Sequence, residues 1–184
     1  MGNAVMQLAD DGFIVVGYKD SFGSGGTDVY LIRTDRIGNT VWTRTFGGPG
    51  DDFGWDVLPA DDGGFIVTGF TNSEGAGGDD ILLLRTNGEG ELLWQRTFGG
   101  AAGERAWAMA PFGEGFVIAG QTKSYGNGDW DIYLIHVSQD GDTLWTTTAG
   151  GKDVDRVFFV TTTEDGQAVF AGMSSSFRPL RVDV

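Results

Sequence analysis

The chain has 184 residues, which is enough for one domain with a substantial apolar core. It carries 26 acidic and 12 basic residues, a formal net charge of −14, and a surface of this sign repels a phosphate backbone, so we exclude nucleic acid as a partner. The absence of cysteine excludes disulfides and thiolate metal sites. No apolar run approaches the roughly 20 residues of a membrane-spanning helix, and the first nine residues lack the basic and apolar regions of a signal peptide.

Glycine, at 32 residues, recurs at fixed positions and marks an internal repeat. The segment GFIVVG at 12–17 returns as GFIVTG at 64–69, as GFVIAG at 115–120 and as QAVFAG at 167–172. The spacings between these segments are 52, 51 and 52 residues. A period near 50 residues is typical of propeller blades and of repeat arrays.

Each repeat predicts four short strands, which we name A to D in chain order. In the second repeat, strand A is WDVLPA at 55–60, strand B is GFIVTG, strand C is DILLLRT at 80–86, and strand D carries the tryptophan of LLWQRTF at 92–98. Acidic-Gly pairs between strands A and B predict hairpin turns. Strands B and C are apolar on both alternating faces and are expected to be buried on both, whereas strand D reads as an outer, half-exposed strand. No segment has a helical period.

These patterns predict an all-β protein, a single β-propeller over residues 1–184 built from four-stranded antiparallel blades. The blade units fall at about 1–48, 49–100, 101–151 and 152–184. A β-solenoid is less favoured because its repeats are usually shorter and parallel, and a β-sandwich would not repeat so regularly.

The last unit reads as incomplete, so that the chain holds about three and a half to four blades. Four A–B hairpins are present but only three C–D hairpins, and Asp183 falls where strand C begins in the other repeats. The segment FRPLRVDV at 177–184 is an alternative last strand with a shifted register. The chain is a fragment of a longer propeller, a four-bladed ring with a short last blade, or a subunit that closes by assembly. An unpaired blade edge favours association, here into a homo-oligomer through the last blade.

Two long segments resemble a known repeat family. FGGPGDDFGWDVLPADDGGFIVTGFTNS at 46–73, continuing into DDILLLRTNGEGELLWQRTFGG at 79–100, is similar to the SBBP-type β-propeller repeat of bacteria and archaea and to its delta-60-like relatives. The resemblance extends over nearly the whole chain and implies the propeller fold. It also implies a secreted or cell-surface location and a protein without an assigned activity, although this chain starts without an export signal.

In a propeller, the B–C and D–A connections emerge on one face, here called the loop face, and the A–B and C–D hairpins emerge on the opposite hairpin face. Asp28, Asp80 and Asp131 start strand C in three repeats, and with Asp79 and Asp129 they are candidate oxygen ligands for Ca²⁺. The alternative is that each Asp caps backbone N–H groups of its loop. Recurrence at one phase favours capping, and no cofactor is required.

One B–C loop carries aromatic residues that the other repeats lack. Tyr125 and Trp130 lie there beside Asp129 and Asp131, and Phe53 of a D–A connection could join them. This group predicts a lectin-like ligand site on the loop face.

Two further sets of residues have a structural and a functional interpretation. Acids of the D–A connections vary between the repeats; they are either ligand contacts or, as we favour, part of a solvated acidic loop. They are Asp51, Asp52, Asp153 and Asp155. Tryptophans recur in strand D, and packing between blades is favoured over a sugar-stacking platform. They are Trp42, Trp94 and Trp145.

The sequence predicts no enzyme. His136, the single histidine, aligns with Arg33 and Arg85 within strand C, which indicates a strand substitution, and no nucleotide-binding glycine motif is present. The prediction is a non-enzymatic interaction or structural scaffold with a protein or glycan partner on the loop face. The alternatives are a Ca²⁺-assisted carbohydrate-binding propeller and a fragment of a larger glycan-active enzyme.

Overall fold

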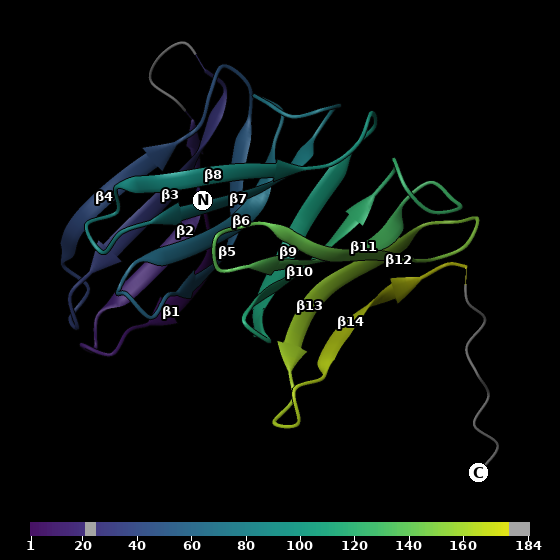
Figure 1. Ribbon diagram of the computed structural model, residues 1–184. Helices are drawn as coiled ribbons and strands as arrows, with labels where there is room; N and C mark the ends of the chain where they lie inside the picture. The colour runs from purple at the N-terminus through teal and green to yellow at the C-terminus, as the bar shows by residue number, and fades with distance from the viewer. Residues whose placement is uncertain (21–24, 177–184) are drawn as a thin grey trace.

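The computed structural model describes residues 1–20 and 25–176, and this part of the chain folds into fourteen strands without a helix (Figure 1). The strands form four antiparallel sheets that follow one another along the chain. The prediction of an all-β chain of repeated antiparallel strands is therefore confirmed. No described helix is long and apolar enough to cross a membrane. The predicted shifted strand at 177–184 lies outside the described residues.

Each sheet pairs its strands in sequence order, as consecutive hairpins require. The first sheet comprises β1 (Gly2–Gln7), β2 (Phe13–Asp20), β3 (Thr27–Thr34) and β4 (Thr40–Phe46). The second comprises β5 (Asp52–Pro59), β6 (Phe65–Thr71), β7 (Asp80–Thr86) and β8 (Leu92–Phe98). The third comprises β9 (Glu104–Phe112), β10 (Gly115–Thr122), β11 (Asp131–Ser138) and β12 (Thr143–Ala149). The fourth comprises β13 (Asp155–Thr162) and β14 (Ala168–Ser174).

Consecutive sheets pack face to face, and we call the side toward the preceding sheet the rear face and the other side the forward face. Val57 and Val67 on the rear face of the second sheet pack with Ile14 and Val16 on the forward face of the first. The next junction repeats this contact, with Ile66 and Leu83 against Ile118 and Ile135, and a third cluster joins the third sheet to the fourth. Side-chain alternation along each strand thus supplies two apolar faces per sheet.

Burial follows the predicted order of strands within a sheet. Every residue of β6, β7 and β10 is buried, because neighbouring sheets cover both of their faces. The strands β4 and β12 are partly or fully exposed, as expected of an outer strand D.

The tryptophans of strand D join consecutive sheets. The ring of Trp42 lies against Gly90 and that of Trp94 against Gly141, both in the C–D turn of the following sheet. These two glycines have positive φ angles of 74° and 80°, and a side chain at either would meet the indole within 2.8 Å. The structure therefore gives Trp42 and Trp94 the packing role that their recurrence predicts.

Every strand A contains a β-bulge at the same position. The register against strand B shifts by one residue in each of the four sheets. The bulged residues are Asn3, Trp55, Trp107 and Phe158. A bulge redirects its side chain out of the regular alternation, so these four side chains leave the packed faces.

Candidate functional site

The aspartates that start strand C cap the loops before them. Asp80 Oδ2 accepts the N–H groups of Ala76 and Gly77 at 3.0 and 3.1 Å, and Asp131 Oδ2 accepts those of Asn127 and Gly128 at 2.8 and 3.0 Å. These contacts support the interpretation in which Asp80 and Asp131, two of the candidate metal ligands, cap backbone N–H groups. Asp28 is also buried at the start of β3, but its loop includes residues 21–24, which lie outside the described residues.

A second buried acid starts each strand A of the last three sheets: Asp52, Glu104 and Asp155. Each carboxylate accepts a backbone N–H of the D–A connection, from Gly48 at 2.8 Å, from Gly100 at 2.6 Å and from Gly151 at 2.9 Å. Each also holds a hydroxyl of the B–C side, as in the 2.6 Å bond from Ser73 to Asp52. The interpretation of Asp52 and Asp155 as acids of a solvated loop that varies between repeats is wrong, because both are buried and Glu104 is their equivalent.

The two sets of acids meet at a glycine in each junction. A Cβ at Gly99 would lie 1.9 Å from Asp80 Oδ1 and 2.6 Å from Glu104 Oε2. Burial, followed by the charges of Glu104 and Asp79, raises the pKa of Asp80. Burial also acts to raise the pKa of Asp155, but bonds from Ser174 and neighbouring groups outweigh it and the pKa lies below its usual value. In each junction, the two carboxylates therefore lie close together beside the glycine. No group of three or more acidic or histidine ligands occurs in the part of the chain that the structure describes.

A run of aromatic rings and two cations lies at the loop-face end of the first three sheets, and we call it the aromatic–cationic surface. It comprises Tyr18, Phe53, Trp55, Phe70, Arg105, Trp107, Lys123 and Trp130. The Phe53 ring lies 4.8 Å from that of Tyr18 and 4.7 Å from that of Phe70. Phe70 in turn faces Trp55 and Trp107.

Arg105 connects the aromatic rings of two sheets. Its guanidinium carbon lies 5.0 Å from the Phe70 ring and 5.6 Å from the Trp130 ring, and its Nε donates to Asp79 Oδ2 at 2.6 Å. Lys123 Nζ lies 4.9 Å from the Trp130 ring centre and 2.9 Å from Asp129. The predicted metal ligands Asp79 and Asp129 therefore neutralise cations that flank an aromatic ring.

The structure brings some of the predicted ligand residues together. Phe53 and Trp130 belong to the aromatic–cationic surface and are linked through Phe70 and Arg105. Tyr125 has other neighbours: its hydroxyl donates to the Gly99 carbonyl at 3.0 Å and its ring packs 5.4 Å from Tyr133.

Sequence reasoning missed Arg105, Trp55 and Trp107 as members of this surface. The rings of Trp55 and Trp107, the bulged residues of β5 and β9, meet edge to face at 4.8 Å. Both indole N–H groups are buried and make no hydrogen bond with any described residue. A tryptophan at the same phase in two repeats was the available signal for this pair.

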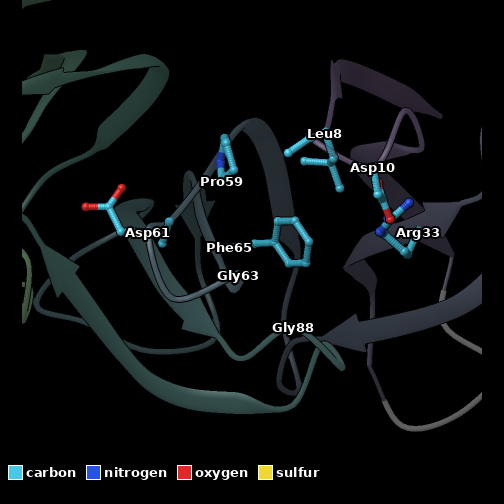
Figure 2. A pocket seen from close by; sticks show the side chains of 10 residues that line it. Leu8, Asp10, Arg33, Pro59, Asp61, Gly63, Phe65 and Gly88 are labelled. Atoms are coloured by element: carbon cyan, nitrogen blue, oxygen red, sulfur yellow. The ribbon is translucent and has the colours of Figure 1, made fainter.

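A hollow of about 410 Å³ opens on the hairpin face between the first and second sheets (Figure 2). Leu8, Pro59 and Phe65 form its apolar wall, and the ion pair between Asp10 and Arg33 lies at its rim. Smaller hollows of about 210 and 150 Å³ occupy the same place in the next two junctions. Their recurrence indicates that the hollow is a property of sheet packing.

The first two hollows differ in the residue that follows strand C at equivalent positions 88 and 139. Gly88 lies at the edge of the first hollow, where Gln139 extends into the second. The first hollow is thus an enlarged version of a general feature.

His136 has the structural place of the arginines that it aligns with. Its Nε2 lies 3.1 Å from the Phe112 carbonyl, and its ring packs edge to face with Phe112 and against Trp145. Arg85 likewise donates to the carbonyl of Thr86 at 3.1 Å and pairs with Asp62. Each of these side chains thus links strand C to the A–B hairpin of its own sheet.

No family model matches this chain. The regulatory protein FlaEY of Caulobacter vibrioides is 28% identical to it in an alignment that covers 84% of this chain and 19% of FlaEY. The chain therefore spans about a fifth of the length of that relative. A match of this identity and coverage shows similarity to FlaEY but does not assign this chain to a family.

Proposed function

We propose that the four sheets are blades of a β-propeller and that the chain acts as a non-enzymatic interaction scaffold. Three features support the blade interpretation: strands pair in sequence order, each sheet packs face to face on the next, and strand D is the exposed outer strand. Asp80 and Asp131 cap their loops and Asp129 pairs with Lys123, which agrees with structural roles for these three acids.

The observation that carries the binding proposal is the position of Arg105 between the rings of Phe70 and Trp130. Tryptophan, tyrosine and arginine are the residues most enriched at the energetic centres of protein interfaces. This partly exposed surface contains all three types, and its two cations are balanced by Asp79 and Asp129. Because these charges balance, the surface is locally neutral although the protein has a net charge of −14. A neutral aromatic surface is suited to binding another protein.

The proposal is tested with a displayed library of random peptides selected on the full chain. Peptides enriched on the wild type should bind the Arg105→Ala and Trp130→Ala variants at least tenfold more weakly. Arg44→Ala is the matched control, because Arg44 lies 5.4 Å from the Trp42 ring on the outer strand β4 and should not affect binding. Equal binding by the wild type and by Arg105→Ala, or the failure to enrich any peptide, would contradict the proposal.

A Ca²⁺-assisted glycan site is the second candidate. One observation favours it: the Oδ1 atoms of Asp80 and Asp131 are buried without a hydrogen-bond partner among the described residues, and each lies near a second carboxylate. Glycan-array binding that requires Ca²⁺ and is lost in Asp131→Asn would support it, and binding that is the same in EDTA would remove it. The interpretation as part of a larger glycan-active enzyme and the secreted or surface location remain predictions.

A further inference from the structure

The rear face of the first sheet is apolar and uncovered. Val5 on this face is 65% exposed, whereas its equivalent in the second sheet, Val57, is 1% exposed. The same contrast holds along the neighbouring strands, where four residues are partly exposed although the second-sheet equivalents are all buried. These four residues are Phe13, Val15, Tyr30 and Ile32. The uncovered rear face therefore has the composition of a sheet junction.

Two details of shape agree with this interpretation. A hollow of about 230 Å³ lies on the rear face, lined by Gly2, Val5 and Val15. The turn glycine Gly38 has φ of 88° and nothing within 4 Å of its Cβ position, whereas the equivalent Gly90 and Gly141 each meet a tryptophan of the preceding sheet. The rear face thus has the hollow and the turn glycine of an internal junction, but no described sheet covers them.

The forward face of the fourth sheet is the opposite uncovered end. Phe159 and Val169 on this face are 58% and 50% exposed. The equivalents of Val169 in the second and third sheets, Ile66 and Val117, are fully buried against the sheet that follows. Exposed apolar area of this kind marks an interaction surface.

We propose that a second copy of this chain docks head to tail, with the forward face of its fourth sheet on the rear face of the first sheet. Each internal junction pairs a forward face with a rear face, and the described chain presents one uncovered example of each. The exposed and partly exposed residues named for the two faces are all apolar or aromatic, so apolar contact would hold the copies together. Such a contact is heterologous and continues into a closed ring or a chain of copies.

This contact is separate from the proposed ligand surface, which lies at the loop face. Failure of the peptide-binding experiment would therefore leave the docking proposal unchanged, and the reverse also holds.

The experiment is native mass spectrometry of the full chain with one variant for each face, Val5→Asp on the rear and Phe159→Asp on the forward face. We expect the wild type to form dimers or larger species and each variant alone to be a monomer. An equimolar mixture should form a 1:1 complex, because Val5→Asp retains an intact forward face and Phe159→Asp an intact rear face.

Val41→Asp is the control. Val41 is 60% exposed on β4, and its equivalents Leu93 and Leu144 are exposed as well, so that its substitution should leave assembly unchanged. A monomeric wild type at all concentrations would overturn the proposal. Self-association of Phe159→Asp alone would also overturn it, because it would indicate contact between two rear faces. A mixture of the two variants that remains monomeric would exclude the head-to-tail arrangement.

Discussion

The first and second sheets have closely similar sequences and different surroundings. Val57 and Val67 of the second sheet are buried against the first sheet, and their equivalents Val5 and Val15 in the first sheet are accessible. The tryptophans of the first two sheets each reach a glycine of the next sheet, so Gly90 is covered, whereas Gly38 has nothing near its Cβ position. The two sheets differ little in strand content or in order of pairing.

This difference indicates that the burial of the apolar faces of each sheet depends on its neighbours. A repeat unit of this kind cannot bury both of its apolar faces alone, and stacking supplies the missing contacts. Substitutions at equivalent positions of the inner and outer sheets should therefore have unequal effects.

The largest effect is expected for Leu83→Ala. Leu83 is fully buried in β7 against the third sheet, and its truncation should lower the free energy of unfolding by about 2–5 kcal/mol. Leu93→Ala removes the same atoms from an exposed position of β8 and should change it by less than about 0.5 kcal/mol. Urea denaturation of both variants measures the difference, and similar losses would contradict the burial described for β7.

Trp94→Ala should be the next most costly substitution. Trp94 packs into the junction and over Gly141 of the following sheet, and we expect a loss of about 2 kcal/mol, below the range for a fully buried ring. Trp145 is partly exposed and contacts Phe112 and His136 of its own sheet, so that Trp145→Ala should cost under about 1 kcal/mol. Thermal unfolding of the two variants tests this order, and a reversed order would show that Trp145 has a further partner.

The repeat made most of the fold predictable. Recurring glycines set the turns. The doubly apolar strands B and C predicted burial on both faces, which is correct for β6, β7 and β10, whereas β2 and β3 are partly exposed on one face and β14 is largely exposed. In the second repeat, strand A begins at Asp52, three residues before the predicted start at Trp55, because the sequence around Asp52 is typical of a loop. Its backbone pairs with Thr71, and its carboxylate is stabilised by bonds that only the folded D–A connection supplies.

Less of the candidate site was predictable. Trp130 was selected because the other repeats lack it, and Phe53 as an aromatic residue of a D–A connection that could join it; both belong to the aromatic–cationic surface. Arg105 was missed because its contacts with Phe70 and Trp130 arise from packing between sheets, which has no local sequence signature. Asp79 and Asp129 were candidate metal ligands, because sequence spacing does not show which cation a carboxylate meets.

Val57→Ala and Val5→Ala form a closer comparison, because the two residues are identical and equivalent. Removal of two buried methyl groups from Val57 should cost about 1–2 kcal/mol. Val5→Ala should cost less than about 0.5 kcal/mol in the monomer. Measured at rising protein concentration, the cost of Val5→Ala should increase toward that of Val57→Ala if a second copy covers the rear face. A cost that does not depend on concentration would count against that contact.

The smallest expected effect is a difference in pH dependence between two aspartates of the second sheet. Asp56 is largely buried and accepts the N–H of Met109 across the junction at 2.8 Å. Burial raises the pKa of its carboxyl, against the lowering effect of the bonds from Met109 and Val57. Its contribution to stability is therefore complete below the usual pKa of 3.8 and is lost as the pH rises through the higher folded-state pKa.

Asp62 at the exposed A–B turn should behave in the opposite sense. Bonds from the Gly64 N–H and from Arg85 lower the pKa of its carboxyl, so its contribution is present above the usual value of 3.8 and is lost as the pH falls through the folded-state pKa. Relative to the wild type, Asp56→Asn should gain stability between pH 4 and pH 7, and Asp62→Asn should lose more at pH 7 than at pH 3. Urea denaturation across this range measures both slopes. Slopes of the same sign would show that Asp56 is in contact with water, and that the junction between the second and third sheets is more open than its apolar neighbours indicate.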